Sequence, residues 1–249
     1  MNIIKKLKSI LPITREKIGV HKYFVLGNKK NFLMYNRYFR KSYSQDGEDM
    51  LLMSLFDGRQ DYKGFYIDIG AHDPIRFSNT QYFYEKGWRG INIDATPGSM
   101  RRFNELRSED INIECGVSDK KENLLYYSFA EAALNSFDPV LSENRINNGW
   151  ILKEKIEIPV LSLNDILRKY LPVNQSVDFI DIDVEGMELQ ILKNFDFDKY
   201  APKYFLLEDL NNVNSVLSEI DSEINIFMKS KNYFPVLKCK RTIIYMIRE

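Results

Sequence analysis

Two short apolar runs that each end in a carboxylate constrain this 249-residue chain more than any other feature. The first, Phe65–His72, reads FYIDIGAH, and the second, Gly90–Asp94, reads GINID. They predict neighbouring strands of an open parallel sheet, where ligands bind at the carboxyl ends of the strands. Gly70 would let the backbone pass close to a ligand, and Asp94 could accept hydrogen bonds from both hydroxyls of a ribose. The two runs together predict a nucleoside-containing cofactor.

Strand and helix signals alternate along most of the chain. Ser78–Gln81 and Thr96–Pro97 have the residue types that begin helices after the first two strands. This alternation predicts an α/β fold with a doubly wound, mostly parallel, Rossmann-like sheet and an antiparallel C-terminal strand pair. The expected sheet strands are 64–69, 90–93, 111–115, 177–182, 203–207, 232–238 and 241–247, with helices over 97–107, 163–171 and 213–230.

One segment interrupts this alternation. Residues 123–129 and 155–161 look like two further strands, separated by a polar insert at 130–153. Long inserts on α/β scaffolds often carry function. We therefore expect a lid or substrate loop, in which Asn135, Ser136 and Arg145 would help to select the acceptor, and the alternative is an ordinary surface loop.

Charge is unevenly distributed although the net charge is zero. Residues 1–41 carry 11 Lys and Arg against Glu16 alone, so the remainder is acidic. An acidic body argues against nucleic-acid binding, which needs a basic footprint on the domain. We therefore predict a catalytic domain over 42–249 preceded by a basic extension over 1–41.

The extension begins with an amphipathic stretch, Met1–Leu11, which is too short and too charged to span a bilayer. It would dock weakly on a membrane surface or a protein partner, fold back on the domain, or serve as an arm in a homo-oligomer. Cys115 and Cys239 are too few for a disulfide scaffold and lie in apolar runs, which predicts two buried free thiols. The expected location is the cytoplasm, with the inner face of the membrane as an option.

The turn after the first strand indicates which cofactor would fit. A dinucleotide site favours three glycines around a pyrophosphate, whereas this turn has one glycine and two carboxylates, Asp68 and Asp73. These carboxylates would repel a pyrophosphate but suit the cationic S-adenosylmethionine. Val117 and Ser118 would flank its adenine, and Gln45 and Glu48 would reach its methionine end unless they only begin a helix. The predicted cofactor-binding residues are Gln45, Glu48, Asp68, Gly70, Asn79, Asp94, Ala95, Val117 and Ser118.

A second acidic group follows the fourth and fifth strands of the predicted sheet. Asp183 lies at the end of one, and Glu208 and Asp209 lie at the end of the other. Clustered carboxylates repel one another unless a cation or shared protons compensate. Oxygen ligands suit Mg²⁺ or Mn²⁺, which would lower the pKa of an acceptor hydroxyl. The alternative is a metal-free site in which one carboxylate with a raised pKa acts as general base.

His72 follows the cofactor glycine and could be a base, a substrate contact or a structural residue. With Asp183 and Glu185 it completes the set of candidate catalytic residues.

These motifs, in this order, resemble the FkbM family of methyltransferases over residues 44–210. The resemblance is carried by SQDGED, DIGAHDP, SNTQYFYEKGWRGINIDATP, IECGVSD, IPVLSLNDIL, DFIDIDVEGMELQIL and LLED. It implies a class I S-adenosylmethionine-dependent fold and O-methylation of a sugar or polyketide hydroxyl. The SQDGED and DIGAHDP motifs look like those of members associated with bacterial surface polysaccharide synthesis.

The carboxylates are also similar to those of metal-dependent O-methyltransferases of the catechol and macrolide-sugar types, at positions that correspond to Asp183, Glu208 and Asp209. Those enzymes usually place Lys or His three residues after the first metal ligand, where this chain has Gly186. The base would therefore come from His72 or Glu185.

The sequence predicts an O-methyltransferase for a sugar hydroxyl, on a nucleotide-sugar or a glycan end. The hydroxyl oxygen would displace the sulfonium in line, largely through positioning. Two alternatives are an NAD-dependent sugar oxidoreductase and a non-catalytic partner-binding module on the same fold.

Overall fold

The computed structural model describes residues 40–56 and 61–248. Ser42–Glu249 forms one compact unit. The predictions for the basic N-terminal extension, including its amphipathic stretch, lie outside the described residues. Within them, no helix is both long enough and apolar enough to cross a membrane.

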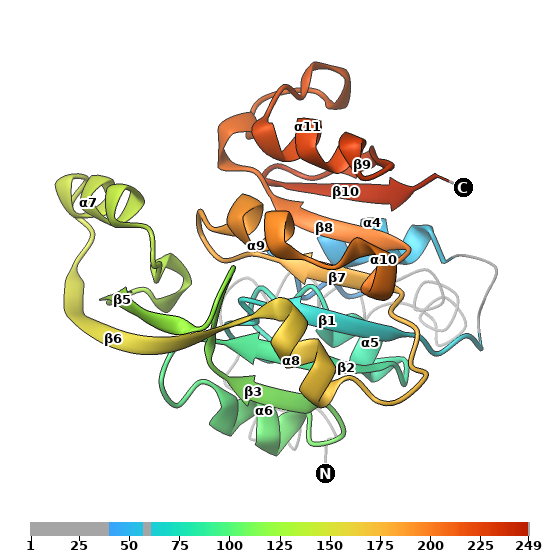
Figure 1. Cartoon of the computed structure of the whole chain (residues 1–249), viewed down its shortest axis with the longest axis horizontal. Coiled ribbons are helices and arrows are strands. Elements are labelled where there is room, and N and C mark those ends of the chain that lie inside the picture. Colours follow the sequence, from blue (N-terminus) through green and yellow to red (C-terminus); the bar gives the residue numbers. More distant parts are fainter. Residues whose placement is uncertain (1–39, 57–60, 249) are drawn as a thin grey trace, which may run out of the picture. The chain divides into compact units, whose positions relative to one another are not determined.

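The centre of the unit is a seven-stranded sheet in the order β3-β2-β1-β7-β8-β10-β9 (Figure 1). The pairs from β3 to β8 are parallel, whereas β10 runs antiparallel to both of its neighbours. The predicted doubly wound, mostly parallel sheet with an antiparallel C-terminal pair is therefore confirmed. The strands are β1 (Phe65–Ile69), β2 (Arg89–Asp94), β3 (Ile111–Glu114), β7 (Phe179–Ile182), β8 (Tyr204–Glu208), β9 (Tyr233–Lys238) and β10 (Thr242–Ile247).

Strand order reverses between β1 and β7, because the chain first builds outward to β3 and then returns to the other side of β1. At such a switch point the loops after the two strands diverge and leave a crevice for a ligand. The helices are α4 (Glu48–Ser54), α5 (Gln81–Glu85), α6 (Met100–Leu106), α7 (Pro139–Asn147), α8 (Leu163–Tyr170), α9 (Glu188–Asn194), α10 (Phe197–Tyr200) and α11 (Glu223–Ser230), with 3₁₀ turns η1 (Ala132–Leu134), η2 (Leu210–Asn212) and η3 (Leu217–Glu219).

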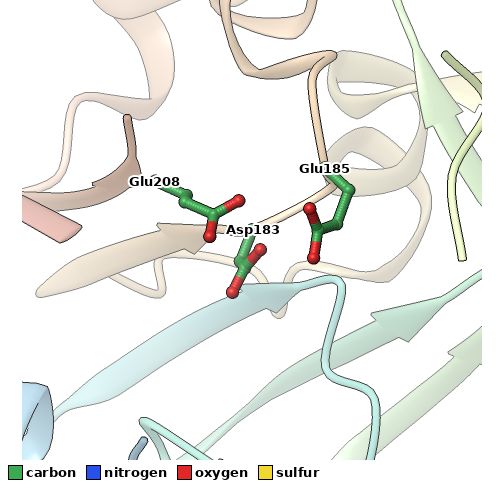
Figure 2. A group of neighbouring side chains, drawn as sticks. All are labelled: Asp183, Glu185 and Glu208. Carbon is green, nitrogen blue, oxygen red and sulfur yellow. The ribbon is translucent and has the colours of Figure 1, made fainter. Parts of the chain in front are cut away.

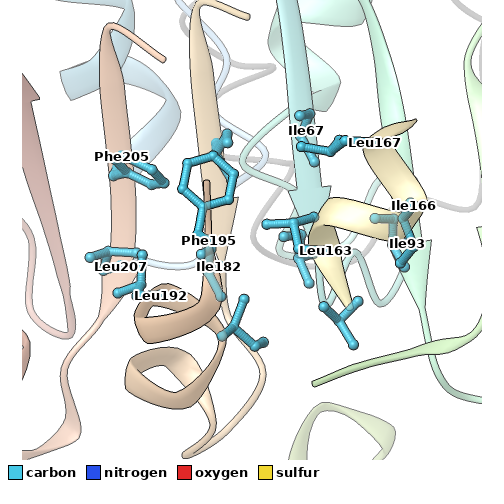
Figure 3. Close-up of a cluster of buried hydrophobic side chains, with 14 of the residues drawn as sticks. Ile67, Ile93, Leu163, Ile166, Leu167, Ile182, Leu192, Phe195, Phe205 and Leu207 are labelled. Atoms are coloured by element: carbon cyan, nitrogen blue, oxygen red, sulfur yellow. The ribbon is translucent and has the colours of Figure 1, made fainter. Parts of the chain in front are cut away.

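Both faces of the sheet are buried, which explains the continuous apolar runs of its strands. On one face the central strands pack against α8 and α9, and Figure 3 shows Ile67, Leu163 and Phe205 in this cluster. On the other face Leu52 of α4 packs with Trp88 and other aromatic residues. Each large apolar side chain buried in this way adds about 1.5–3 kcal/mol to stability.

A second, three-stranded sheet leads away from the first. It consists of β4 (Gly116–Ser118), β6 (Leu152–Ser162) and β5 (Glu122–Phe129), in that order. The strands expected at 123–129 and 155–161 are thus present, and they pair with each other as an antiparallel ribbon. The insert between them holds η1 and α7, and Figure 1 shows α7 at the far end of the ribbon.

Three local predictions were wrong. The helix expected over 213–230 is replaced by a 3₁₀ turn and the shorter α11, because the Ser222 hydroxyl accepts from the backbone nitrogen of Asn225 and starts a new helix there. The helix expected from residue 97 begins at Met100, because Gly98 has a φ of 81° that interrupts it. Cys239 is half-buried rather than buried, whereas Cys115 is buried and both are free thiols.

Candidate functional site

A cavity of about 550 Å³ opens at the carboxyl ends of β1, β2, β7 and β8. It lies at the switch point of the sheet, and the insert supplies one of its walls. Of the predicted site residues, those that line the cavity are Gln45, Glu48, Gly70, His72, Asn79, Asp94, Ala95, Val117, Asp183, Glu185 and Glu208. The sheet therefore brings together most of the residues that sequence reasoning selected, although they come from six separate segments.

Gly70 forms the turn after β1. Its φ is 86°, and its backbone nitrogen donates to the carbonyl of Ile93 in β2 (2.9 Å). The same carbonyl accepts from Ala71 (3.1 Å), so the turn bends toward the end of β2. The floor of the cavity is thus made of backbone, with no side chain at the glycine.

Asp94 is held in a fixed orientation at the end of β2. One carboxylate oxygen accepts from the backbone nitrogen of His72 (2.9 Å), and the other accepts from that of Thr96 (2.8 Å). Each oxygen keeps a further acceptor position, because a carboxylate has about four. The arrangement can accept hydrogen bonds from a diol in the cavity.

The His72 ring lies beside the positively charged Arg76. The guanidinium of Arg76 is 3.2 Å from His72 Nε2 and can only donate, so this nitrogen is its acceptor. Burial, the largest cause, and the charge of Arg76 lower the pKa of His72, while Asp94 opposes the shift. The lowered pKa favours the neutral imidazole, and its Nε2 is already engaged by Arg76, which is a poor arrangement for a general base.

Asp68 was expected to bind cofactor, but the structure places it beneath the cavity. Its carboxylate accepts from the Thr80 hydroxyl (2.5 Å), and Thr80 accepts from the fully buried Arg107 (2.9 Å). Burial raises the pKa of Asp68 to about 6, while the charge of Arg107 lowers it. Asp68 supports the cavity floor and does not line it.

Asn79 connects this buried layer to the cavity that it lines. Its amide nitrogen donates to Asp181 of β7 (2.8 Å). The other oxygen of Asp181 has no hydrogen-bond partner in the described chain, and burial followed by repulsion from Asp68 raises its pKa. The amide of Asn79 is thereby oriented with its nitrogen toward the sheet.

Three carboxylates converge where β7 and β8 end. One oxygen each from Asp183, Glu185 and Glu208 lies within 4.8 Å of the others, and Figure 2 shows the three groups pointing toward one another. Asp183 is exposed to the cavity, Glu185 is half-buried and Glu208 is buried. Glu208 Oε2 is fully buried and has no hydrogen-bond partner among the described residues.

The loop that carries Asp183 and Glu185 is fixed by its own backbone. The Asp183 nitrogen donates to Ile69 of β1 (2.9 Å), and Glu188 at the start of α9 accepts from the nitrogen of Val184 (3.0 Å). Glu185 takes a left-handed conformation with a φ of 57°. This conformation turns the chain so that Glu185 faces back toward Asp183.

Burial is the first cause that raises the pKa values of all three carboxyls above their ordinary range. Repulsion from Glu185 adds to the shift of Asp183, and repulsion from Asp183 adds to that of Glu208. Because Asp183 is open to cavity water, solvent screens part of its shift. A proton or a cation would relieve this repulsion.

Two other predicted residues do not line the cavity. Asp209 turns to η2, where its oxygens accept from the backbone of Asn211 (3.2 Å) and the side chain of Asn212 (2.9 Å). Glu185 occupies the third place in the carboxylate group that was predicted for Asp209. Ser118 is buried in β4 and bonds to Asp119, whereas Val117 beside it lines the cavity.

Gln45 and Glu48 line the cavity from the segment before β1, and Glu48 is also the first residue of α4. Glu48 is buried, and its carboxylate accepts from the backbone nitrogen of Asp46 (2.9 Å) and more weakly from the Thr242 hydroxyl (3.4 Å). Asp46 pairs with Arg241 from the turn between β9 and β10 (3.5 Å). This end of the cavity is therefore closed by residues almost 200 positions apart in sequence.

Several cavity residues were missed from the sequence. Thr96 was interpreted as a helix cap, but its hydroxyl lies 2.9 Å from the Tyr126 hydroxyl in β5. Tyr126, Thr96 and Arg241 all line the cavity. No motif marks Tyr126 or Arg241, because each reaches the site through strand pairing between distant segments.

Comparison with known proteins identifies the family of this chain. The model of the methyltransferase FkbM domain matches residues 68–235, which is more than half of the chain. The chain belongs to the FkbM methyltransferase family. Its FkbM domain contains the β1 turn, Asp94 and the three convergent carboxylates, while Gln45, Glu48 and Arg241 lie outside the matched residues.

Among solved structures, this FkbM-family chain is similar to the methyltransferase FkbM from Methylobacillus flagellatus KT, determined at 2.20 Å. The identity is 16%, the TM-score is 0.42, and the match covers 75% of this chain and 44% of that one. The chain therefore spans less than half the length of that relative. No curated protein matches the chain.

Proposed function

We propose that this chain is an S-adenosylmethionine-dependent O-methyltransferase that modifies a sugar hydroxyl with the help of a divalent cation. The observation that carries the proposal is a single cavity that holds both the fixed Asp94 carboxylate and the convergent group of Asp183, Glu185 and Glu208. The first feature suits a nucleoside, and the second suits a cation and the hydroxyl that it would activate.

The donor would lie over the β1 turn. Asp94 would accept from the ribose hydroxyls, and Val117 would contact the adenine. Gln45 and Glu48, at the other end, would hold the methionine part, where a carboxylate suits the ammonium group. Gly70 lets this turn pack against the loop that carries Asp183, because an added Cβ would lie 1.7 Å from the Asp183 carbonyl oxygen. When bound, S-adenosylmethionine supplies an electrophilic methyl group.

Asp183, Glu185 and Glu208 would hold Mg²⁺ or Mn²⁺, for which oxygen donors are the usual ligands. A cation would satisfy the buried Oε2 of Glu208, which has no hydrogen-bond donor among the described residues, and a proton shared with Asp183 would satisfy it in the metal-free alternative. When bound, the cation would lower the pKa of an acceptor hydroxyl beside it. Glu208 is the only proposed ligand from the end of β8, and Glu185 takes the place that was expected for Asp209.

The proton of the acceptor hydroxyl also needs a destination. His72 is disfavoured because its Nε2 accepts from Arg76, and Glu185 is disfavoured because it pairs with Arg145. In the metal-free alternative, Asp183 would accept the proton, since its carboxyl is open to the cavity and its pKa is raised. Dependence of turnover on added Mg²⁺ distinguishes the two mechanisms.

The charges of the cavity bear on the acceptor. Seven carboxylates and three arginines line it, and each arginine pairs with a carboxylate: Arg76 with Glu131, Arg145 with Glu185, and Arg241 with Asp46. No lysine is among the described lining residues. A neutral glycan end fits this cavity better than a nucleotide-sugar, whose diphosphate would meet no free cationic side chain among the described lining residues. The same charges argue against an NAD-dependent oxidoreductase.

The test is calorimetry of S-adenosylhomocysteine binding to the full chain, with and without Mg²⁺. We expect micromolar binding by the wild type and at least a tenfold loss in Asp94→Asn, with no change in Glu109→Gln, whose carboxylate is exposed. NAD is titrated in parallel. Binding of NAD in place of S-adenosylhomocysteine would support the oxidoreductase, and binding of neither would favour the partner-binding module.

A further inference from the structure

The insert is fastened to the cavity through one residue of the carboxylate group. Arg145 of α7 pairs with Glu185 Oε2, and its other terminal nitrogen donates to the carbonyl of Leu134 within the insert (2.7 Å). The Ser136 hydroxyl donates to the backbone carbonyl of Glu185 (2.8 Å). Both the side chain and the backbone of Glu185 are therefore held by the insert.

A third contact joins the same two segments. Asp138 caps the start of α7, accepting from the backbone nitrogens of Val140 and Leu141. It also lies so close to Gly186 that an added Cβ there would be 3.0 Å from its carboxylate. The start of α7 thus rests against the turn that directly follows Glu185.

The pair of Arg145 and Glu185 is largely removed from solvent. The exposed fractions of the two side chains are 10% and 16%. A carboxylate that loses its partner in such a place is left with an uncompensated charge. The left-handed backbone of Glu185 is also a conformation that a non-glycine residue keeps only when its surroundings impose it. Arg145 is therefore well placed to determine where Glu185 points.

We propose that Arg145 is the positioning residue of the cation site and that cation binding fixes the insert as the acceptor wall. Arg145 holds one oxygen of Glu185, which leaves the other for a cation shared with Asp183 and Glu208. One carboxylate connects the cation to α7. Cation binding and the docked position of the insert are therefore linked, and each stabilises the other. This inference rests on the proposed function, since it assigns a cation to that site.

Trp150 offers a direct readout of the insert. Its backbone nitrogen donates to the Arg145 carbonyl (3.0 Å), it lines the cavity, and it is 50% exposed. The only other tryptophan, Trp88, is 2% exposed in the apolar core. A fluorescence change on cation binding would therefore report on Trp150, and its loss in Trp150→Phe would prove the assignment. Mg²⁺ is the probe, because it does not itself quench.

The experiment measures Mg²⁺ affinity by calorimetry and Trp150 fluorescence in the full chain. We expect Mg²⁺ to change the fluorescence of the wild type. Arg145→Met should weaken Mg²⁺ binding by about 10- to 100-fold, as is typical for residues that orient a metal ligand, and abolish the fluorescence response. Arg145→Lys should recover most of the affinity, because it restores a cation beside Glu185. Arg168→Met, which changes an exposed arginine on α8, should behave as the wild type.

Two results would overturn the inference: wild-type Mg²⁺ affinity in Arg145→Met, or a silent Trp150 in the wild type at saturating Mg²⁺. Should Arg145→Met not fold, the Mg²⁺ affinity of Arg145→Lys and the fluorescence response of the wild type still test the inference. S-adenosylhomocysteine binding, measured in the same samples, distinguishes failure of the cation-site inference from failure of the proposed function. If the wild type binds S-adenosylhomocysteine but not Mg²⁺, only the cation site is rejected. If it binds neither ligand, the methyltransferase proposal is rejected as well.

Discussion

The α-carbon of Gly70 faces the backbone carbonyl of Asp183 so closely that an added Cβ would lie 1.7 Å from its oxygen. The Asp183 nitrogen also donates to Ile69, the residue before Gly70. The turn that would carry the methyl donor and the loop that carries the carboxylates are thus packed backbone against backbone. This contact fixes the distance between the two halves of the candidate site.

Gly70→Ala should therefore be severely destabilising. The substitution adds a backbone clash to a left-handed φ of 86°, and the expected loss is more than about 3 kcal/mol. Gly98→Ala is the matched control, because its φ is 81° but no atom lies within 4 Å of the added Cβ. It should cost only about 1 kcal/mol. Urea denaturation of both variants measures the difference, and equal losses would mean that the contact with Asp183 is unimportant.

The second prediction concerns the carboxylates at the ends of β7 and β8. Glu208→Gln and Asp183→Asn should each abolish Mg²⁺ binding, because each removes one of three ligands. Asp209→Asn should retain it, since that carboxylate is turned to η2. Calorimetry with Mg²⁺ on the three variants is the measurement. Loss of binding in Asp209→Asn with a wild-type melting temperature would return Asp209 to the ligand set.

Stability should depend on pH through Asp68. Its pKa is raised to about 6, first by burial, so the folded protein binds this proton more tightly than the unfolded chain. The stabilisation from this protonated carboxyl is therefore present at about pH 4 and is lost as pH rises above 6, which lowers the unfolding free energy. Asp68→Asn lacks this titration while keeping an oxygen for the Thr80 hydroxyl.

Between pH 4 and pH 7 the wild type should consequently lose about 2 kcal/mol of unfolding free energy relative to Asp68→Asn. Urea denaturation across this range measures the shift. A difference that stays constant with pH would show that Asp68 has an ordinary pKa in the folded protein.

Much of the fold follows from the sequence, because strands buried on both faces are continuous apolar runs and their ends carry polar residues. Asp94, Gly70 and Asp183 could be placed at one edge of the sheet on that basis alone. The second sheet could not, since nothing local in 123–129 or 155–161 says which strand each will pair with.

The details of the site depend on side-chain direction, which sequence spacing does not contain. Asp209 and Glu185 both lie shortly after a strand, yet Asp209 caps a 3₁₀ turn while Glu185 adopts a positive φ and lines the cavity. Asp68 was assigned to the cofactor because its partner Thr80 lies in a helix start, and Arg107, which donates to Thr80 from 39 residues beyond Asp68, has no motif. Tertiary contacts decide both cases.

The last prediction concerns the acceptor. Because every described arginine that lines the cavity is paired with a carboxylate, a diphosphate would have to break an ion pair to bind. With labelled S-adenosylmethionine and Mg²⁺, we expect transfer to neutral glycan ends and none to UDP-sugars, and free UDP should not inhibit. Label on a UDP-sugar would mean that an arginine leaves its partner. Arg241→Gln, which removes the partner of Asp46, would then raise the KM for that acceptor, whereas Arg168→Gln would leave it unchanged.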